Sequence, residues 1–233
     1  MIQEIKQYKT ADLVLQVSKN YNPATLNLSE WDRYLDILCS DRQYQKEAIQ
    51  TTIIFLASGL YKSIDDLVEE NWHNPKMVEL KTRYNSIDDY LHHLQLKGKL
   101  SANIDLATGT GKSYVIYGIA QIMLGLGLVD RVLVLCPSLT IEDGLMEKFN
   151  ALASDPALLK AIPEESKYKN PSIKNADVTI KEGDICVENI HAVYDRTGSS
   201  IKDRFSGKGK TTLVMNDEAH HIYNEVEGRD KEA

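Results

Sequence analysis

Hydrophobic residues in the second half of the chain fall into blocks whose lengths suit strands and helices in turn. Residues 131–136 (RVLVLC) form a near-continuous apolar run, typical of a strand buried on both faces, and Pro137 ends it. Helical patterns precede this run at residues 112–124 and follow it at residues 140–152. Shorter strands are expected at residues 104–106, 184–187 and 212–216. The alternation predicts an α/β fold, a mainly parallel sheet with flanking helices.

The N-terminal part of the chain shows helical spacing instead. Residues 44–60 predict a helix that ends near Gly59. The motif SIDD occurs at residues 63–66 and 86–89, each time before an apolar helical pattern. We interpret both copies as helix N-caps rather than as an internal repeat, because serine accepts backbone N–H groups and aspartate favours the positive end of a helix. Apolar side chains before about Ser40 are expected to pack on the later part of the chain: Leu26, Leu28, Trp31, Tyr34, Leu35 and Leu38.

These patterns predict the domain organisation. We expect an N-terminal segment at residues 1–40 and an α/β domain at residues 41–233, with a helical insertion at about residues 60–100. Residues 153–183 contain three prolines and many Lys and Glu residues, so a surface excursion of the chain is expected there. The last stretch, residues 224–233, is charged and adds no further predicted element.

Composition narrows the functional classes. The chain has 233 residues, 42% of them hydrophobic and 26% charged, which is typical of a soluble globular protein with a sizeable core. Its 27 Lys and Arg residues against 34 Asp and Glu residues give a net charge of -7. The chain as a whole is therefore no polycation built to coat nucleic acid, although a local basic groove is compatible with this balance.

The cysteines and the apolar runs indicate in which cellular compartment the protein is expected. Cys39, Cys136 and Cys186 show no CxxC spacing, which argues against a disulfide framework and a zinc site and favours the cytoplasm. Cys136 is interpreted as a buried strand residue rather than a nucleophile. The longest apolar run, residues 115–129, contains Gln121 and falls short of the roughly 20 residues that span a bilayer, so no membrane role is expected.

The sequence LATGTGKS, residues 106–113, lies between an expected strand and an expected helix. Glycine allows backbone N–H groups to approach an anion closely, and the following helix presents its positive N-terminus to that anion. Gly109 and Gly111 supply this approach in a loop that also contains Thr108 and Thr110. Leu106 stands where the strict pattern GxxxxGK[ST] has glycine.

Two side chains after this loop suit a triphosphate. Lys112 can place its charge at the β- and γ-phosphates, and Ser113 can offer a hydroxyl to magnesium, so ATP and Mg²⁺ are the expected ligands. A second GK[ST] triplet, residues 209–211, follows a polar turn and precedes a strand. It lacks the strand-before, helix-after context, and we interpret it as a solvated basic loop.

The sequence MNDEAHH, residues 215–221, ends an expected buried strand. Asp217 can anchor magnesium at the carboxyl end of that strand, and Glu218 can orient and deprotonate an attacking water. A solvated acidic turn is the alternative for this pair taken alone. A zinc site of Asp217, Glu218, His220 and His221 is disfavoured, because neither HExxH nor cysteine ligands accompany it. His92 and His93 are expected on a helix surface.

Together these motifs resemble a known family. ATGTGKS followed by DEAH resembles motifs I and II of superfamily 2 helicases and translocases. Residues 41–49 (DRQYQKEAI) are similar to the RxYQxEAI sequence of the motor subunits of type I and type III restriction enzymes. Residues 132–139 resemble motif Ia, and residues 187–194 (VENIHAVY) are similar to a segment of type III subunits.

The resemblance implies the first lobe of a RecA-like P-loop ATPase. In that family Arg42 and Gln45 would recognise adenine, which suits a glutamine amide because it donates and accepts at once. His220 would couple the nucleotide state to a second RecA-like lobe and to DNA, and the motif Ia loop would touch the backbone of duplex DNA. Implied partners are that second lobe, a nuclease domain and a methyltransferase or specificity subunit.

The expected function is an ATP-hydrolysing motor of a DNA helicase or translocase, within a type III-like restriction enzyme. One alternative is a helicase-like ATPase of repair, replication or phage origin without a nuclease, and another is a non-enzymatic ATP-dependent switch. A small-molecule kinase is less expected, because it would explain neither the DEAH match nor the RxYQ match. The sequence ends soon after DEAHH, before any motif of a second lobe, so we expect a fragment that folds but hydrolyses ATP poorly alone.

Overall fold

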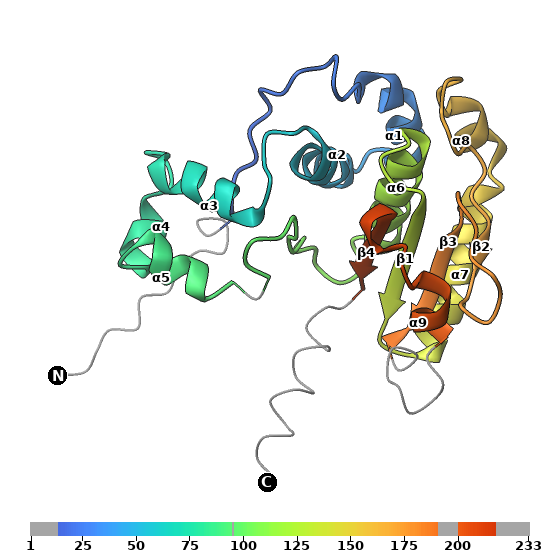
Figure 1. Ribbon diagram of the computed structural model, residues 1–233. Helices are drawn as coiled ribbons and strands as arrows, with labels where there is room; N and C mark the ends of the chain where they lie inside the picture. Colours follow the sequence, from blue (N-terminus) through green and yellow to red (C-terminus); the bar gives the residue numbers. More distant parts are fainter. Residues whose placement is uncertain (1–13, 95, 191–199, 218–233) are drawn as a thin grey trace, which may run out of the picture. The chain divides into compact units, whose positions relative to one another are not determined.

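The computed structural model describes residues 14–94, 96–190 and 200–217 (Figure 1). The chain divides into two compact units, the first comprising Met1–Asn27 and Gln50–Asp105 and the second Leu28–Ile49 and Leu106–Ala233. Within the described ranges, no helix is long and apolar enough to cross a lipid bilayer. Each unit has its own arrangement of elements, and the candidate site belongs to the second.

The second unit is built on a parallel four-stranded sheet of order β2-β3-β1-β4. Its strands are β1 (Arg131–Cys136), β2 (Ile173–Lys174), β3 (Ile185–Asn189) and β4 (Thr212–Asn216). Strand β1 pairs with β3 through Val132↔Ile185 and with β4 through Arg131↔Thr212. The buried central position of β1 agrees with its near-continuous apolar sequence, and the parallel sheet confirms the predicted α/β class.

Helices cover both faces of this sheet. Alternate residues of a strand point to opposite faces, so Leu133 and Leu135 share one face, where they pack with Ile201 of α9 (Ser200–Phe205). Val132 and Val134 point to the other face and are fully buried. Helices α6 (Lys112–Gly125) and α7 (Leu139–Ala153) pack against β1, and α8 (Pro156–Ala161) packs on α1 (Asp32–Cys39) and α7.

Helix α6 is enclosed by side chains that approach its backbone at two glycines. The indole of Trp31, in the 3-10 helix η2 (Ser29–Trp31), lies over Gly125. Leu38 of α1 and Ile49 of α2 (Gln43–Ala57) meet at Gly118, where an added Cβ would lie 2.6 Å from Ile49 Cδ1. The apolar positions predicted to pack are all buried: Leu26, Leu28, Trp31, Tyr34, Leu35 and Leu38.

The first unit is helical. Its helices α3 (Ile64–His73), α4 (Val78–Arg83) and α5 (Ile87–His92) follow the C-terminal part of α2, which ends before Gly59 at φ 78°. Both SIDD motifs are N-caps, as predicted, because Ser86 Oγ accepts the Asp89 N–H at 3.0 Å and Asp66 Oδ2 accepts the Ser63 N–H at 3.3 Å. The core of this unit contains Phe55, Tyr61, Ile64, Leu67, Val68 and Leu91. His92 and His93 are exposed, as expected.

Two sequence expectations differ from the structure. The strand expected at residues 104–106 is not formed, and Ile104 is 42% exposed there. Three residues, with Asp105 in the middle, supply too few ladder hydrogen bonds and too little buried surface to define a strand by themselves. Residues 153–183, expected as a surface excursion, contain α8 and β2, and they bury Leu158, Ala161, Ala176 and Ile180.

Two buried carboxyl groups meet at the carboxyl end of β3. Glu142 Oε2 accepts two hydrogen bonds from Asn189, one from the backbone N–H at 3.0 Å and one from Nδ2 of the side chain at 2.9 Å. Glu188 Oε2 accepts the Ala176 N–H at 2.8 Å, and its Oε1 accepts Asn189 Nδ2 at 3.2 Å. Burial raises the pKa of Glu188 above its usual value, and the nearby Glu142 charge adds to the shift.

The contact at Gly125 yields a stability prediction. In the substitution Gly125→Ala, the new Cβ would lie 2.4 Å from two ring carbons of Trp31, so α6 or η2 must shift. We expect a loss of about 1–3 kcal/mol in the free energy of unfolding, measured by urea denaturation. The control Gly144→Ala, inside α7 with no atom near the new Cβ, is expected to gain about 0.5–1 kcal/mol. Equal stability of the two variants would contradict this account.

The raised pKa of Glu188 predicts a pH dependence. Between the unfolded and the folded pKa, the folded protein keeps a proton that the unfolded chain loses, so this carboxyl lowers stability as the pH rises. The variant Glu188→Gln cannot titrate there, and its stability relative to wild type should increase from pH 4 to pH 7 in urea denaturation. Glu147→Gln, at an exposed position of α7, is the control and should show no such trend. If the stability difference between Glu188→Gln and wild type stayed constant over this pH range, the raised pKa of Glu188 would be refuted.

Candidate functional site

The glycine-containing loop forms a tight turn directly before α6. Gly109 and Gly111 both have φ 80°, in the left-handed region where side chains are strained. The Thr110 N–H and hydroxyl both donate to the Ala107 carbonyl, at 3.3 and 2.6 Å. Gly111 is the N-cap of α6. The N–H groups of the first helical turn therefore point out of the helix at the end where the loop lies. Thr108 lies in the same turn.

The length of α6 places this loop at the carboxyl edge of the sheet. A turn at Gly127, with φ 68°, reverses the chain between α6 and β1, and α6 packs against β1. The 14 residues of α6 span about 21 Å and the 6 residues of β1 about 20 Å. Because helix and strand run in opposite directions over similar lengths, we infer that Lys112 and Ser113 lie near the level of the carboxyl end of β1.

Asp217 lies at the same edge. It follows β4 directly, and its backbone N–H donates to the Leu135 carbonyl of β1 at 2.8 Å. The carboxyl ends of β1 and β4 are therefore joined next to this carboxylate. Glu218, His220 and His221 lie outside the described residues. Asp217 thus follows the strand after which the sequence placed it, and its role as a magnesium ligand stays a prediction.

Helix α2 brings the other predicted residues to the loop. Gln45 is fully buried, and its Nε2 donates to the Thr110 carbonyl at 2.6 Å, with the Gly111 carbonyl at 3.4 Å. A Cβ added to Gly111 would lie 2.6 Å from Gln45 Nε2 and 3.7 Å from Arg42 Nη1. Arg42 and Gln45 therefore lie against the loop, as a shared site requires.

The hydrogen bonds fix which way the Gln45 amide faces. Both neighbouring loop atoms are carbonyl oxygens, so the amide nitrogen must point to them and Oε1 must point away. Among the described residues, Oε1 is buried without a hydrogen-bond partner. An oxygen in this state suits a donor of a ligand, such as the exocyclic amine of adenine.

Ion pairs hold α2 in its place beside α1. Lys46 Nζ binds Asp36 Oδ1 at 2.7 Å and Asp32 Oδ1 at 3.3 Å. The hydrogen bond to Asp36 is the main cause that raises the pKa of Lys46. Since Lys46 follows Gln45 in α2, these contacts and the packing of Ile49 at Gly118 set the distance between Gln45 and the loop.

Sequence reasoning missed one residue of this contact. The Tyr44 hydroxyl also donates to the Thr110 carbonyl, at 2.8 Å, and its side chain is exposed on the other side. The tyrosine stands inside the quoted stretch DRQYQKEAI, next to Gln45. Its position in that motif was the available signal, but no chemistry was assigned to it.

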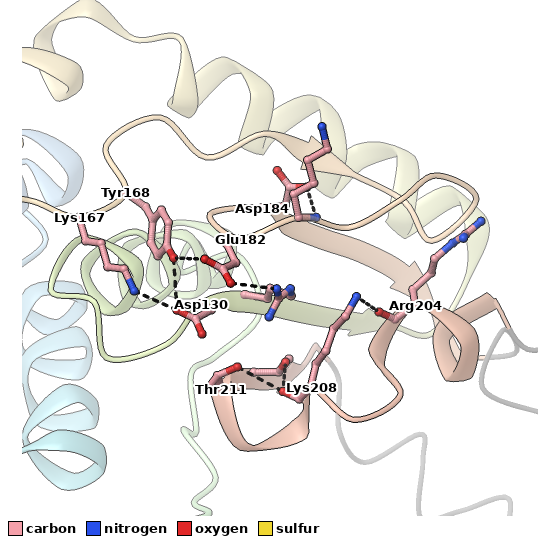
Figure 2. Close-up of polar contacts among 11 residues, drawn as sticks. Asp130, Lys167, Tyr168, Glu182, Asp184, Arg204, Lys208 and Thr211 are labelled. Atoms are coloured by element: carbon pink, nitrogen blue, oxygen red, sulfur yellow. Dashed lines mark hydrogen bonds and ion pairs between the residues drawn. The ribbon is translucent and has the colours of Figure 1, made fainter.

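The second GK[ST] triplet lies at the opposite edge of the sheet. Gly209–Thr211 forms the 3-10 helix η5 before β4, Lys210 is exposed, and the Thr211 carbonyl accepts the Asp130 N–H at 2.8 Å. The expected solvated loop is confirmed. Around it, Figure 2 shows a polar network of the amino edge, where Asp130 Oδ1 binds Lys167 Nζ at 3.0 Å. This hydrogen bond is the main cause that lowers the pKa of Asp130.

Elsewhere in the described chain, side chains that could bind a metal are dispersed and the thiols are buried. In the part of the chain that the structure describes, no three His, Cys, Asp or Glu residues gather as a metal site. Cys39, Cys136 and Cys186 are free and buried, and burial raises the pKa of Cys136 to about 12. Cys136 is thus a buried strand residue, as predicted, and a poor nucleophile.

The donor set at the carboxyl edge fits magnesium and a triphosphate. Two glycines in the left-handed region lie in the loop, a helix N-terminus and Lys112 would offer positive charge, and Ser113 and Asp217 carry oxygen atoms of the kind that magnesium prefers. All of these groups belong to residues that the structure describes. The helix after the loop packs on a parallel sheet, as in nucleotide-binding α/β domains, but no strand directly precedes the loop in the described chain.

Comparison with known proteins gives one family. The family described as type III restriction enzyme, res subunit, matches residues 38–231. No curated protein and no solved structure matches this chain. The matched range contains the loop before α6, the RxYQ helix and Asp217. Because it covers most of the chain, the protein belongs to the type III restriction enzyme res subunit family and carries the RecA-like, helicase-like ATPase domain of restriction enzymes.

Proposed function

We propose that this chain is the first ATP-binding lobe of a DNA-translocating motor in a type III-like restriction enzyme. The single observation that carries the proposal is the contact between Gln45 and the Thr110 carbonyl, at 2.6 Å. It joins a side chain suited to adenine to a loop suited to phosphates, and both are needed for ATP. Family membership supports ATP hydrolysis and interaction with DNA as the coarser expectation.

In this proposal the loop binds the triphosphate. Backbone N–H groups of Gly109 and Gly111 and the N-terminus of α6 donate to phosphate oxygens, and Lys112 neutralises the β- and γ-phosphates. Ser113 and Asp217 hold magnesium, which when bound draws charge from the phosphate oxygens and makes the γ-phosphoryl group easier to displace. Glu218 orients the attacking water and accepts its proton.

The base is read by α2. Gln45 Oε1 accepts the N6 amine of adenine, while the second hydrogen of Nε2 can donate to N7. Guanine has the acceptor O6 where adenine has this amine. O6 would face Gln45 Oε1, which is also an acceptor, so no hydrogen bond could form there. The orientation of the amide therefore favours ATP over GTP, and Arg42 lies close enough to the loop to contact the same nucleotide.

The loop after β1 is the proposed DNA contact. Pro137 and Ser138 leave the sheet at its carboxyl edge, and Ser138 Oγ caps α7 by accepting the Ile141 N–H at 3.4 Å. A capped helix N-terminus suits the phosphate backbone of duplex DNA. His220 would couple this contact to the nucleotide and to a second RecA-like lobe. A nuclease domain and a methyltransferase or specificity subunit are the further partners proposed.

The test compares two lysines that both follow glycine. Lys112→Ala in the full-length protein should abolish DNA-stimulated ATP hydrolysis, because the charge at the β- and γ-phosphates is lost. Lys210→Ala, in the triplet at the opposite edge, is the matched control and should hydrolyse ATP like wild type. Phosphate release is measured with and without duplex DNA.

Each unexpected outcome has a defined meaning. Full turnover by Lys112→Ala would refute the phosphate site. Binding of ATP by the wild-type protein without any phosphate release, with or without DNA, would instead favour an ATP-dependent switch that performs no hydrolysis.

A further inference from the structure

Two side chains of α2 donate to one backbone carbonyl. Thr110 lies between the two left-handed glycines, and its carbonyl oxygen accepts Tyr44 Oη at 2.8 Å and Gln45 Nε2 at 2.6 Å. A carbonyl oxygen has two lone pairs, so both bonds can form together. They hold the peptide group that joins Thr110 to Gly111, next to two glycines whose backbone is conformationally permissive.

The two donors differ in what else they can bind. Gln45 is fully buried and keeps an unpartnered Oε1, so its amide has a further ligand to satisfy. Tyr44 is 43% exposed and has one hydroxyl hydrogen, which its bond to Thr110 uses. A base that engages the Gln45 amide uses Oε1 and the second hydrogen of Nε2, whereas the Tyr44 hydroxyl contacts only the loop and keeps its bond to Thr110 in either case.

We propose that Tyr44 is a positioning residue for the phosphate loop. Its hydroxyl holds the Thr110 carbonyl, which keeps Gly109 and Gly111 in their left-handed conformation whether or not Gln45 is bound to a base. The inference rests on the proposed ATP site and deepens it. It separates the two neighbours by task, with Gln45 reading the base and Tyr44 acting on the triphosphate through the loop.

This division of tasks has a measurable signature. Loss of the Tyr44 hydroxyl should weaken every ligand that carries a triphosphate by the same factor, including one without a base. Since one hydrogen bond is removed, the dissociation constant is expected to increase roughly threefold to tenfold. Loss of the Gln45 amide should instead reduce the preference for ATP over GTP.

The experiment is calorimetric titration of the full-length protein with Mg-ATP, Mg-GTP and inorganic tripolyphosphate. Tyr44→Phe is compared with Gln45→Ala and with the control Tyr168→Phe. The control removes a hydroxyl at the amino edge, where it lies 3.2 Å from Asp130 Oδ1. We expect Tyr44→Phe to weaken all three ligands equally, with an unchanged ATP to GTP ratio, and Tyr168→Phe to bind like wild type.

A second measurement does not depend on affinity. Hydrogen exchange of residues 107–111 without nucleotide should be faster in Tyr44→Phe than in wild type, with the rest of the chain unchanged. Wild-type binding of tripolyphosphate by Tyr44→Phe, or a loss confined to ATP, would overturn the inference and leave the ATP site standing. If the wild-type protein bound no Mg-ATP, the proposed function itself would fail, and the inference with it.

Discussion

The close packing of α6 is the constraint on which the candidate site depends. Trp31 lies over Gly125 near one end of this helix, and Leu38 and Ile49 meet it at Gly118. A larger residue at either glycine would move α6 away from its neighbours. Because α2 carries both Ile49 and Gln45, the spacing set at Gly118 also sets how closely Gln45 approaches the loop. Core packing and ligand geometry are thus determined by the same contacts.

The sheet separates two kinds of polar chemistry at its two edges. At the amino edge, Asp130 Oδ1 accepts hydrogen bonds from Lys167 and Tyr168 (Figure 2), and the Asp130 N–H donates to the Thr211 carbonyl, which joins the segments before β1 and β4. At the carboxyl edge, Gln45 keeps an acceptor that nothing in the described chain satisfies. Matched charges stabilise the first edge, and the second edge holds the unpaired acceptor that the proposed base site would use. Both edges contain a GK[ST] triplet, but only the triplet that precedes a helix belongs to the site.

Much of this arrangement was predictable, and the failures have physical reasons. Strand β1 was predicted with its observed bounds, because burial on both faces leaves a near-continuous apolar run. The strand at residues 104–106 was wrong, since so short a run depends on partners that a sequence does not display. The contact of Tyr44 was missed for a related reason: the motif draws attention to the residue, but its partner is a backbone carbonyl 66 positions away, and carbonyls leave no sequence signature.

The unpartnered oxygen of Gln45 links ligand binding to protein stability. Burying an acceptor without a donor costs about 1–3 kcal/mol, and Gln45 Oε1 has no donor among the described residues. Any ligand that donates to the oxygen removes the penalty while it adds its own contacts. An apolar side chain at position 45 would avoid the same cost, but it would also remove the hydrogen bond to the Thr110 carbonyl and the amide that we propose distinguishes one base from another.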